Sequence, residues 1–184
     1  MGPQGVFQVR LRELEQELHE KENRIQKQLA QIEAIYTFAP VGLCVLDKDL
    51  RFVRVNERLA EMNGIASADH IGKPVREIVS DLGKLAEEIG TSILETGKPR
   101  LNLEISGSTA KAPGVQRHWM EHWVPIKDES GAVTGINVVA EEITDLKRAE
   151  DTIRRKNAIL QGINRVFEAV LIPLSDEDFG RVCL

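Results

Sequence analysis

Residues 41–62 read VGLCVLDKDLRFVRVNERLAEM, and their pattern predicts two strands followed by a short helix. Leu43–Leu46 is a short, continuous apolar run of the kind that forms a buried strand. Asp47–Asp49 predicts a turn, and Arg51–Val55 has the alternating character of a second strand. We therefore expect these two strands to form a hairpin.

A short helix is expected directly after the hairpin. Asn56 precedes the helix-forming segment Glu57–Met62, and its side-chain oxygen can cap the first turn. Asn63 and Gly64 follow, and this pair is typical of the end of a helix.

A longer helix and three strands complete this part of the chain. Apolar residues recur on one face of Leu82–Thr96, and Gly97 follows its last turn. The strand-like stretches Arg100–Ile105, Val115–Ile126 and Ala132–Ile143 come next, separated by polar loops. Because strands and helices do not alternate as in parallel sheets, the fold class is α+β with an antiparallel sheet.

The segment before this domain is predicted to be a long helix. Phe7 to Ile35 contains no Gly or Pro, and its residues favour helices. Apolar residues recur every seven positions on two companion registers: Leu11, Leu18, Ile25 and Ile32, and Phe7, Leu14 and Ile35 with Lys21 and Gln28 as polar interruptions. Such a narrow seam favours a parallel coiled-coil dimer over a single helix folded onto its own domain, which remains the alternative.

The segment after the domain repeats this pattern. Leu146, Ile153, Leu160 and Phe167 share one heptad register, and Lys156 interrupts the companion register. The predicted organisation is a coiled-coil helix at 1–36, a globular domain at 37–144, a second coiled-coil helix at 145–172 and the start of a further domain at 173–184.

Composition excludes several classes of protein. The chain has 184 residues, of which 42% are hydrophobic, with a net charge of -5. A mildly acidic chain is not expected to bind nucleic acid, and no apolar run approaches the length of a membrane span. Cys44 and Cys183 stand in a chain without secretory features, so we expect free thiols and a cytoplasmic location.

The middle of the chain resembles a PAS domain. The matching segments are Ala39–Asp47, Val55–Glu57, Ile71–Pro74, Trp123–Gly131 and Glu142–Thr144. In the last segment Glu142 stands where the family usually has Asp. The resemblance implies a PAS fold with a five-stranded antiparallel sheet in the order 2-1-5-4-3. It also implies a sensor module of a prokaryotic signal-transduction histidine kinase.

The end of the chain resembles the beginning of a GAF domain. The segments that carry this likeness are Ile159–Phe167 and Phe179–Leu184. In multi-domain sensor kinases a PAS module often precedes a GAF domain, so the likeness agrees with the same class of protein.

No catalytic residues or metal ligands are predicted. His118 and His122 are four residues apart, which on a strand separates them by about 13 Å, too far to bind one metal ion. His19 is followed by an acid, as in kinase phosphoacceptor sites, but its context favours an exposed helix face. Glycine-rich nucleotide motifs are absent from the sequence, so we expect no enzymatic activity.

The resemblance to PAS domains leaves the cofactor unknown. Flavin is disfavoured because Cys44 lies on the first strand, whereas the flavin-binding members carry their cysteine on the helical side. Haem is disfavoured because the helix Leu82–Thr96 has no histidine. His70, the nearest alternative, is expected in an exposed loop.

The two tryptophans mark a candidate ligand pocket. Trp119, Glu121 and Trp123 share one face of their strand, and the resemblance points this face inward. Glu121 is expected to contact a polar ligand between hydrophobic or cation–π walls. The alternatives are that it pairs with an Arg or a backbone N–H, or that the strand register places it on the outer face. The candidate pocket residues are Trp119, Glu121, Trp123, Leu85, Ile89, Ile136 and Val138.

The expected function is detection of a small-molecule or protein signal and its relay through the helices of a homodimer. Glu142 and Thr144 are expected to hydrogen-bond where the sheet continues into the helix, and Leu146, Ile153 and Leu160 to lie on the paired seam. The alternative is a ligand-free PAS scaffold that binds a partner on the outer sheet face near Met120 and His122.

Overall fold

The computed structural model describes residues 3–171, which divide between Glu142 and Ile143 into two compact units. The first unit contains a long helix and the globular domain, and the second contains the last helix. The elements are α1 (Pro3–Phe38), β1 (Gly42–Leu46), β2 (Phe52–Val55), α2 (Glu57–Asn63), α3 (Ser67–His70), α4 (Val75–Ile78), η1 (Ser80–Leu82), α5 (Gly83–Thr96), β3 (Arg100–Gly107), β4 (Arg117–Lys127), β5 (Val133–Glu142) and α6 (Thr144–Leu171).

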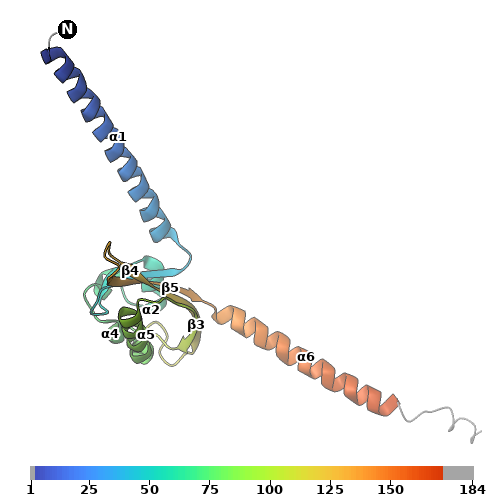
Figure 1. The fold of residues 1–184 in the computed structure, drawn as a ribbon. Helices are drawn as coiled ribbons and strands as arrows, with labels where there is room; N and C mark the ends of the chain where they lie inside the picture. Colours follow the sequence, from blue (N-terminus) through green and yellow to red (C-terminus); the bar gives the residue numbers. More distant parts are fainter. Residues whose placement is uncertain (1–2, 172–184) are drawn as a thin grey trace, which may run out of the picture. The chain divides into compact units, whose positions relative to one another are not determined.

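The five strands form one antiparallel sheet in the order β2-β1-β5-β4-β3 (Figure 1). This is the predicted order 2-1-5-4-3, so the predicted α+β fold with its antiparallel sheet is confirmed. The β1–β2 hairpin is also confirmed, with Cys44 opposite Val55. Its turn is closed by Asp47, whose Oδ1 accepts hydrogen bonds from the backbone N–H groups of Asp49 and Arg51, both at 2.9 Å.

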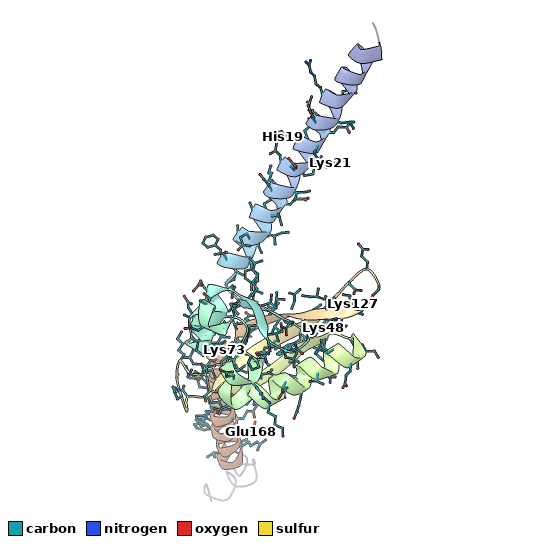
Figure 2. The ribbon with its side chains drawn as sticks, turned by 90° about the vertical axis from the view of Figure 1, so that its left-hand side faces the viewer. His19, Lys21, Lys48, Lys73, Lys127 and Glu168 are labelled. Carbon is teal, nitrogen blue, oxygen red and sulfur yellow. The ribbon has the colours of Figure 1, made fainter. Side chains whose placement is uncertain are left out.

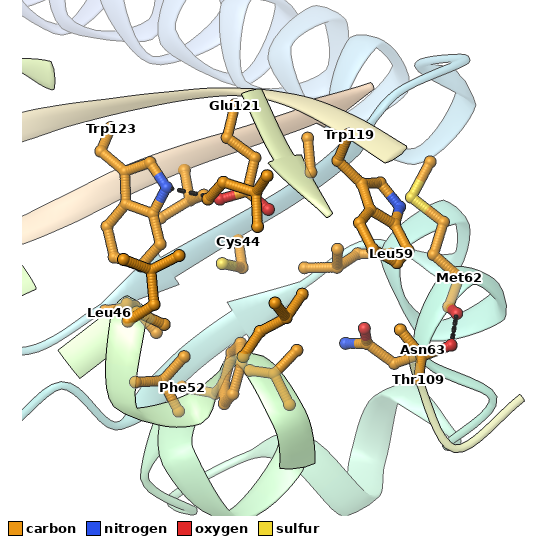
Figure 3. A pocket seen from close by; sticks show the side chains of 18 residues that line it. Cys44, Leu46, Phe52, Leu59, Met62, Asn63, Thr109, Trp119, Glu121 and Trp123 are labelled. Carbon is orange, nitrogen blue, oxygen red and sulfur yellow. Dashed lines mark hydrogen bonds between the residues drawn. The ribbon is translucent and has the colours of Figure 1, made fainter. Parts of the chain in front are cut away.

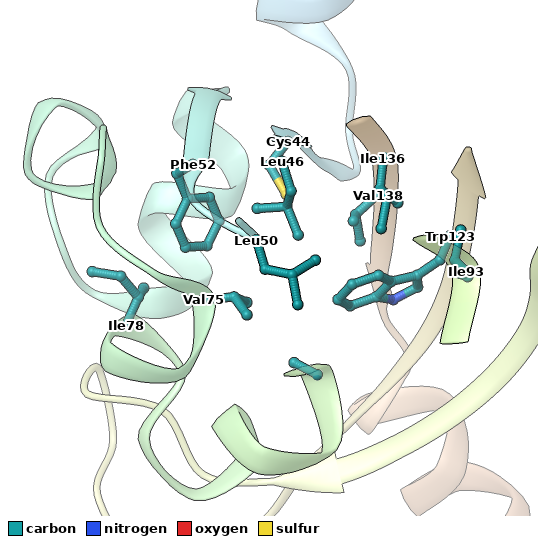
Figure 4. Close-up of a cluster of buried hydrophobic side chains, with 11 residues drawn as sticks. Cys44, Leu46, Leu50, Phe52, Val75, Ile78, Ile93, Trp123, Ile136 and Val138 are labelled. Atoms are coloured by element: carbon teal, nitrogen blue, oxygen red, sulfur yellow. The ribbon is translucent and has the colours of Figure 1, made fainter. Parts of the chain in front are cut away.

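The hydrophobic core lies between the sheet and the helices α2 to α5, which cover one face of it (Figure 1). Strand residues that point to this face alternate with exposed or half-buried ones, as the period of two requires. Leu46, Ile93 and Ile136 are completely buried (Figure 4). The core therefore joins the central strands β1 and β5 to helix α5.

The predicted helix ends are confirmed. The Oδ1 atom of Asn56 accepts a hydrogen bond of 3.0 Å from the backbone N–H of Leu59 and so caps α2. Gly64 and Gly97 end α2 and α5 in the left-handed region, at φ values of 73° and 62°. A side chain there would strain the backbone, which is why glycine follows both helices.

Two strand boundaries differ from the prediction by two residues, and the others by no more than one. The third strand continues beyond Ile105 to Gly107, because Ser106 and Gly107 pair with His118 and Arg117 of β4. β4 consequently begins at Arg117 instead of Val115. The pairing of two distant segments sets these ends, and local sequence does not contain that information.

The prediction for His70 was wrong. This residue ends the short helix α3 and is completely buried, whereas the sequence indicated an exposed loop. Burial is stabilised because both ring nitrogens have hydrogen-bond partners and the ring packs edge-on against Phe52, with centroids 5.2 Å apart.

The flanking helices expose the predicted apolar seams in the single chain. On α1, Leu18, Ile25 and Ile32 are each more than half exposed. His19 and Lys21 also lie on its surface, as Figure 2 shows. In the described part of the chain no helix is both long and apolar enough to cross a membrane. The GAF-like segment at 173–184 and Cys183 lie outside the described residues.

Candidate ligand cavity

Strand β4 presents Trp119, Glu121 and Trp123 to the helical side of the sheet, as predicted. Alternation along the strand places all three side chains on one face, where they line a partly open cavity (Figure 3). Trp119 and Trp123 are 4% and 3% exposed, so the two indole rings form part of the core. The carboxyl group of Glu121 lies between them in this view.

The cavity is small and mostly apolar. The space that the centre of a water molecule can reach is about 60 Å³. The cavity therefore has room for several water-sized groups. Its walls come from the sheet, from α2, α4 and α5, and from the loop that follows β3.

Most of the predicted pocket residues lie together. Leu85 and Val138 line the cavity beside the three β4 residues. Ile136 instead lies completely buried in the core cluster, and Ile89 packs against that cluster. These two residues support the walls and are not among the residues that line the cavity.

The carboxyl group of Glu121 lies in an unusual electrostatic environment. Its Oε2 accepts a hydrogen bond of 2.7 Å from the indole Nε1–H of Trp123. Burial raises the pKa of the carboxyl group above its ordinary value, and the bond from Trp123 opposes this shift. Burial, with a contribution from nearby Glu121, also raises the pKa of the Cys44 thiol, so this thiol is neutral.

The partner of Glu121 was not among the alternatives that the sequence suggested. An Arg or a backbone N–H was expected, and the donor is the indole of Trp123, two positions along the same strand. A carboxyl group held in this way keeps hydrogen-bonding capacity for a ligand, because a carboxyl group has acceptor sites on two oxygens.

Asn63 adds a polar wall that sequence reasoning missed. Its Nδ2 donates to Nε2 of His70 at 3.0 Å, and Nδ1 of His70 donates to the carbonyl oxygen of Ala66 at 2.9 Å. Since Nε2 accepts a hydrogen bond and Nδ1 donates one, the imidazole is the neutral Nδ1–H tautomer. The Asn63-Gly64 pair indicated only the end of a helix.

The loop after β3 closes another side of the cavity. The hydroxyl of Thr109 donates to the carbonyl oxygen of Met62 at 2.9 Å, and the N–H of Lys111 donates to the carbonyl oxygen of Asn63 at 3.1 Å. Thr109 and Met62 both line the cavity. Two hydrogen bonds therefore fasten this loop to the end of α2, and nothing in the local sequence indicated the contact.

The two histidines of β4 do not form a metal site with each other. His118 hydrogen-bonds through Nδ1 to the Ser106 hydroxyl at 2.7 Å, and Nδ1 of His122 accepts the N–H of Asn102 at 3.2 Å. They lie on a strand, as predicted. Within residues 3–171 the structure brings together no group of three or more His, Cys, Asp or Glu side chains suited to a metal ion.

A second polar cluster connects α1 to the domain. Oδ1 of Asn56 accepts from the N–H of Leu43 at 2.9 Å, in addition to capping α2. Its Nδ2 donates to the carbonyl oxygens of Tyr36 and Val41 at 3.1 and 3.0 Å. One buried amide thus joins the end of α1 with β1 and α2. The sequence indicated only its capping role.

The predicted relay residues lie on both sides of the division between the two units. In the first unit Glu142 forms an ion pair with Arg117 of β4, at 3.1 Å from Nη1 to Oε1. In the second unit Thr144 begins α6, and Leu146, Ile153 and Leu160 are 57–60% exposed along it.

This fold, with its partly open cavity, defines a class of small α+β domains, and comparison with known families identifies the class. Residues 38–148 match the family model described as the PAS fold. Since this match covers more than half of the chain, the chain belongs to the PAS family. A search among curated proteins gave no match.

Solved structures share the fold at low sequence identity. A PAS domain from Colwellia psychrerythraea has a TM-score of 0.55 and 19% identity over 64% of this chain and 98% of that domain. The PAS domain of Bordetella pertussis BvgS has a TM-score of 0.52 and 22% identity, over 71% and 98% of the two chains.

VqmA from Vibrio cholerae, in a complex with ligand and DNA, has a TM-score of 0.54 and 22% identity. The match covers 69% of this chain and 57% of VqmA. This chain therefore spans little more than half of the length of VqmA. At these identities the three structures show the common fold.

Proposed function

We propose that this PAS domain detects a small molecule in the cavity beside Glu121 and relays its presence through α1 and α6 of a homodimer. The output is a downstream domain such as a histidine kinase. The observation that carries the proposal is the carboxyl group of Glu121 in a largely apolar cavity, where Asn63 and Thr109 are the other polar lining residues. Burying such a group costs free energy, and binding sites combine apolar walls with a few polar groups in this way.

The route to α1 runs through Asn56. Leu59, Met62 and Asn63 of α2 line the cavity, and Asn56 caps that same helix while holding the carbonyl oxygen of Tyr36 at the end of α1. A ligand that shifts α2 therefore acts on hydrogen bonds that also hold α1.

Further contacts fasten the end of α1 to the domain. The Tyr36 hydroxyl donates to the carbonyl oxygen of Leu43 at 3.1 Å, and the Arg54 guanidinium lies 3.9 Å from the centroid of the Tyr36 ring. Arg54 also pairs with Glu33 of α1. Movement of β1 or β2 relative to the cavity is thus transmitted to the last turns of α1.

The route to α6 begins on β5. Val138 and Ala140 line the cavity, and the same strand ends at Glu142, after which the chain continues into α6. The exposed seam of α6 is apolar, and a second copy of the same seam would bury it. In a pair of copies, a change in the conformation of β5 would therefore alter the packing between the two α6 helices.

The proposed module acts in the cytoplasm and without catalysis of its own. Its alternative is a ligand-free PAS scaffold, which the small volume of the cavity favours. A scaffold would bind its partner on the sheet face that carries Met120 and His122, both half-buried.

Native mass spectrometry of the purified chain tests detection of a small molecule. We expect a bound small molecule in the wild type and its loss in Ala140→Leu, because the added carbons occupy the cavity that Ala140 lines. Ala132→Leu, at an exposed position, is the matched control and should keep the ligand. A wild-type chain that carries no small molecule, with unchanged dimerisation in Ala140→Leu, would favour the scaffold.

Disulfide cross-linking tests the relay helix. In a Cys183→Ser background, single cysteines at Leu146, Ile153 and Leu160 should give symmetric dimers, whereas a cysteine at Arg155, off the seam, should not. Equal cross-linking at seam and off-seam positions would contradict a paired α6.

A further inference from the structure

The cavity also indicates which chemical class of ligand it binds. We propose that it takes a small organic monocation, a short primary alkylammonium ion, whose charged end meets Glu121 and whose alkyl end meets the apolar walls. This inference rests on the proposed sensory function and specifies its ligand.

The charges of the lining residues decide between cation and anion. Of the side chains that line the cavity, Glu121 and Cys44 are ionisable, and none is Lys, Arg or His. An anion would enter low-dielectric surroundings with no positive partner and next to an acid, which is unfavourable. An ammonium ion would instead have Glu121 as its counter-ion once the carboxyl group is ionised.

The two tryptophans hold the carboxyl group of Glu121 in the cavity. This group lies between the indoles of Trp119 and Trp123 in Figure 3. Trp123 also donates its N–H to Glu121, which holds the carboxyl group at this place. A metal ion is not favoured, because it would require several oxygen ligands and the walls supply mostly carbon and sulfur.

The volume limits the size of the ligand. Room for several water-sized groups is enough for an amine with a short alkyl chain. The chain would contact apolar side chains such as Leu59, Val79 and Leu82, which line the helical side of the cavity. Larger ring systems and nucleotides exceed this space.

Binding of the ammonium ion is expected to release a proton. Burial raises the pKa of Glu121 in the free protein and so favours its protonated form, whereas the bound cation favours the carboxylate. The proton leaves to solvent, and the complex holds one carboxylate and one ammonium. The other ionisable group that lines the cavity is Cys44 on β1, which burial keeps neutral.

Calorimetric titration of the purified chain with n-butylammonium, n-butanol and butyrate tests the proposal. We expect n-butylammonium to bind at least about tenfold more tightly than n-butanol, which corresponds to about 1.4 kcal/mol, and butyrate not to bind. Glu121→Gln keeps the volume and an acceptor for Trp123, and it should remove this preference. Glu141→Gln, at an exposed position on β5, should preserve it.

The pH dependence provides a second readout. Between about pH 5 and about pH 8 the amine stays protonated, since its pKa resembles that of lysine. Wild-type affinity should rise with pH, by up to about tenfold per unit below the pKa of Glu121, and the affinity of Glu121→Gln should stay constant.

Three results would overturn the inference: equal binding of n-butanol and n-butylammonium, unchanged n-butylammonium affinity in Glu121→Gln, or no binding of n-butylammonium to the wild type. In each case the proposed sensory function is judged separately, by the small molecule that native mass spectrometry detects in the wild type and its absence in Ala140→Leu.

Discussion

Asn56 offers the sharpest test of how the domain holds α1. The side chain is 3% exposed and makes four hydrogen bonds, with backbone groups of Tyr36, Val41, Leu43 and Leu59. Asn56→Ala removes a helix cap, at about 1 kcal/mol, and leaves the N–H of Leu43 without its partner, at about 1–3 kcal/mol. With two carbonyl oxygens also losing a donor, we expect a total destabilisation of about 3–5 kcal/mol.

Urea unfolding followed by tryptophan fluorescence measures this loss, because Trp119 and Trp123 are both buried in the same unit. The slope of the transition should not change, since the variant alters stability and not the surface exposed on unfolding. Asn137→Ala, at an exposed position on β5, is the control and should change stability by no more than about 0.5 kcal/mol. A loss of less than about 1.5 kcal/mol in the free energy of unfolding of Asn56→Ala would show that water replaces the lost hydrogen bonds, and would contradict the predicted role of Asn56.

Two other predictions concern local backbone and charge. Gly64 and Gly114 both have positive φ, but a Cβ at Gly64 would lie 2.6 Å from the Cα of Lys111, whereas Gly114 has open space. In the same urea assay, Gly114→Ala should cost about 1–2 kcal/mol and Gly64→Ala about 1–3 kcal/mol more, and equal costs would contradict the contact. The Ser130 hydroxyl and backbone N–H groups lower the pKa of Asp128. The ionised carboxylate therefore stabilises the turn at any pH above the ordinary pKa of about 3.9, and this contribution is lost as the pH falls through the lowered pKa. A carboxyl titration by NMR should give a midpoint below that of an unfolded peptide, and Ser130→Ala should raise it; a midpoint that Ser130→Ala leaves unchanged would argue against the hydroxyl as its cause.

The parts of the fold that local patterns determine were predictable from the sequence. The hairpin and the helix caps at Asn56, Gly64 and Gly97 depend on residues that are close in the chain. The strand order came from the resemblance to PAS domains and agreed with the order of the predicted elements. The burial of His70 was not predictable. It depends on the side chain of Asn63, seven residues earlier, and on the ring of Phe52 on β2.

The candidate site was predictable only along β4. Alternation alone puts Trp119, Glu121 and Trp123 on one face of β4, and one of the two faces of this strand must meet the core. Asn63 and Thr109 reach the same cavity from α2 and from the loop after β3. Their positions follow from tertiary packing, so no spacing in the sequence relates them to Glu121.

The buried polar side chains explain how occupancy of the cavity would reach α1. Asn63, at the end of α2, lines the cavity, and Asn56, at the start of α2, holds α1. Since α2 is only seven residues long and is hydrogen-bonded at both ends, a displacement of one end is expected to reach the other. A ligand that displaces Asn63 must therefore strain the bonds of Asn56, because unpaired buried groups cost too much for either end to give way alone. An Asn56→Ala chain should therefore still bind the ligand in the cavity but pass less of its effect to α1, because the contacts of Tyr36 with Leu43 and of Arg54 with Glu33 remain.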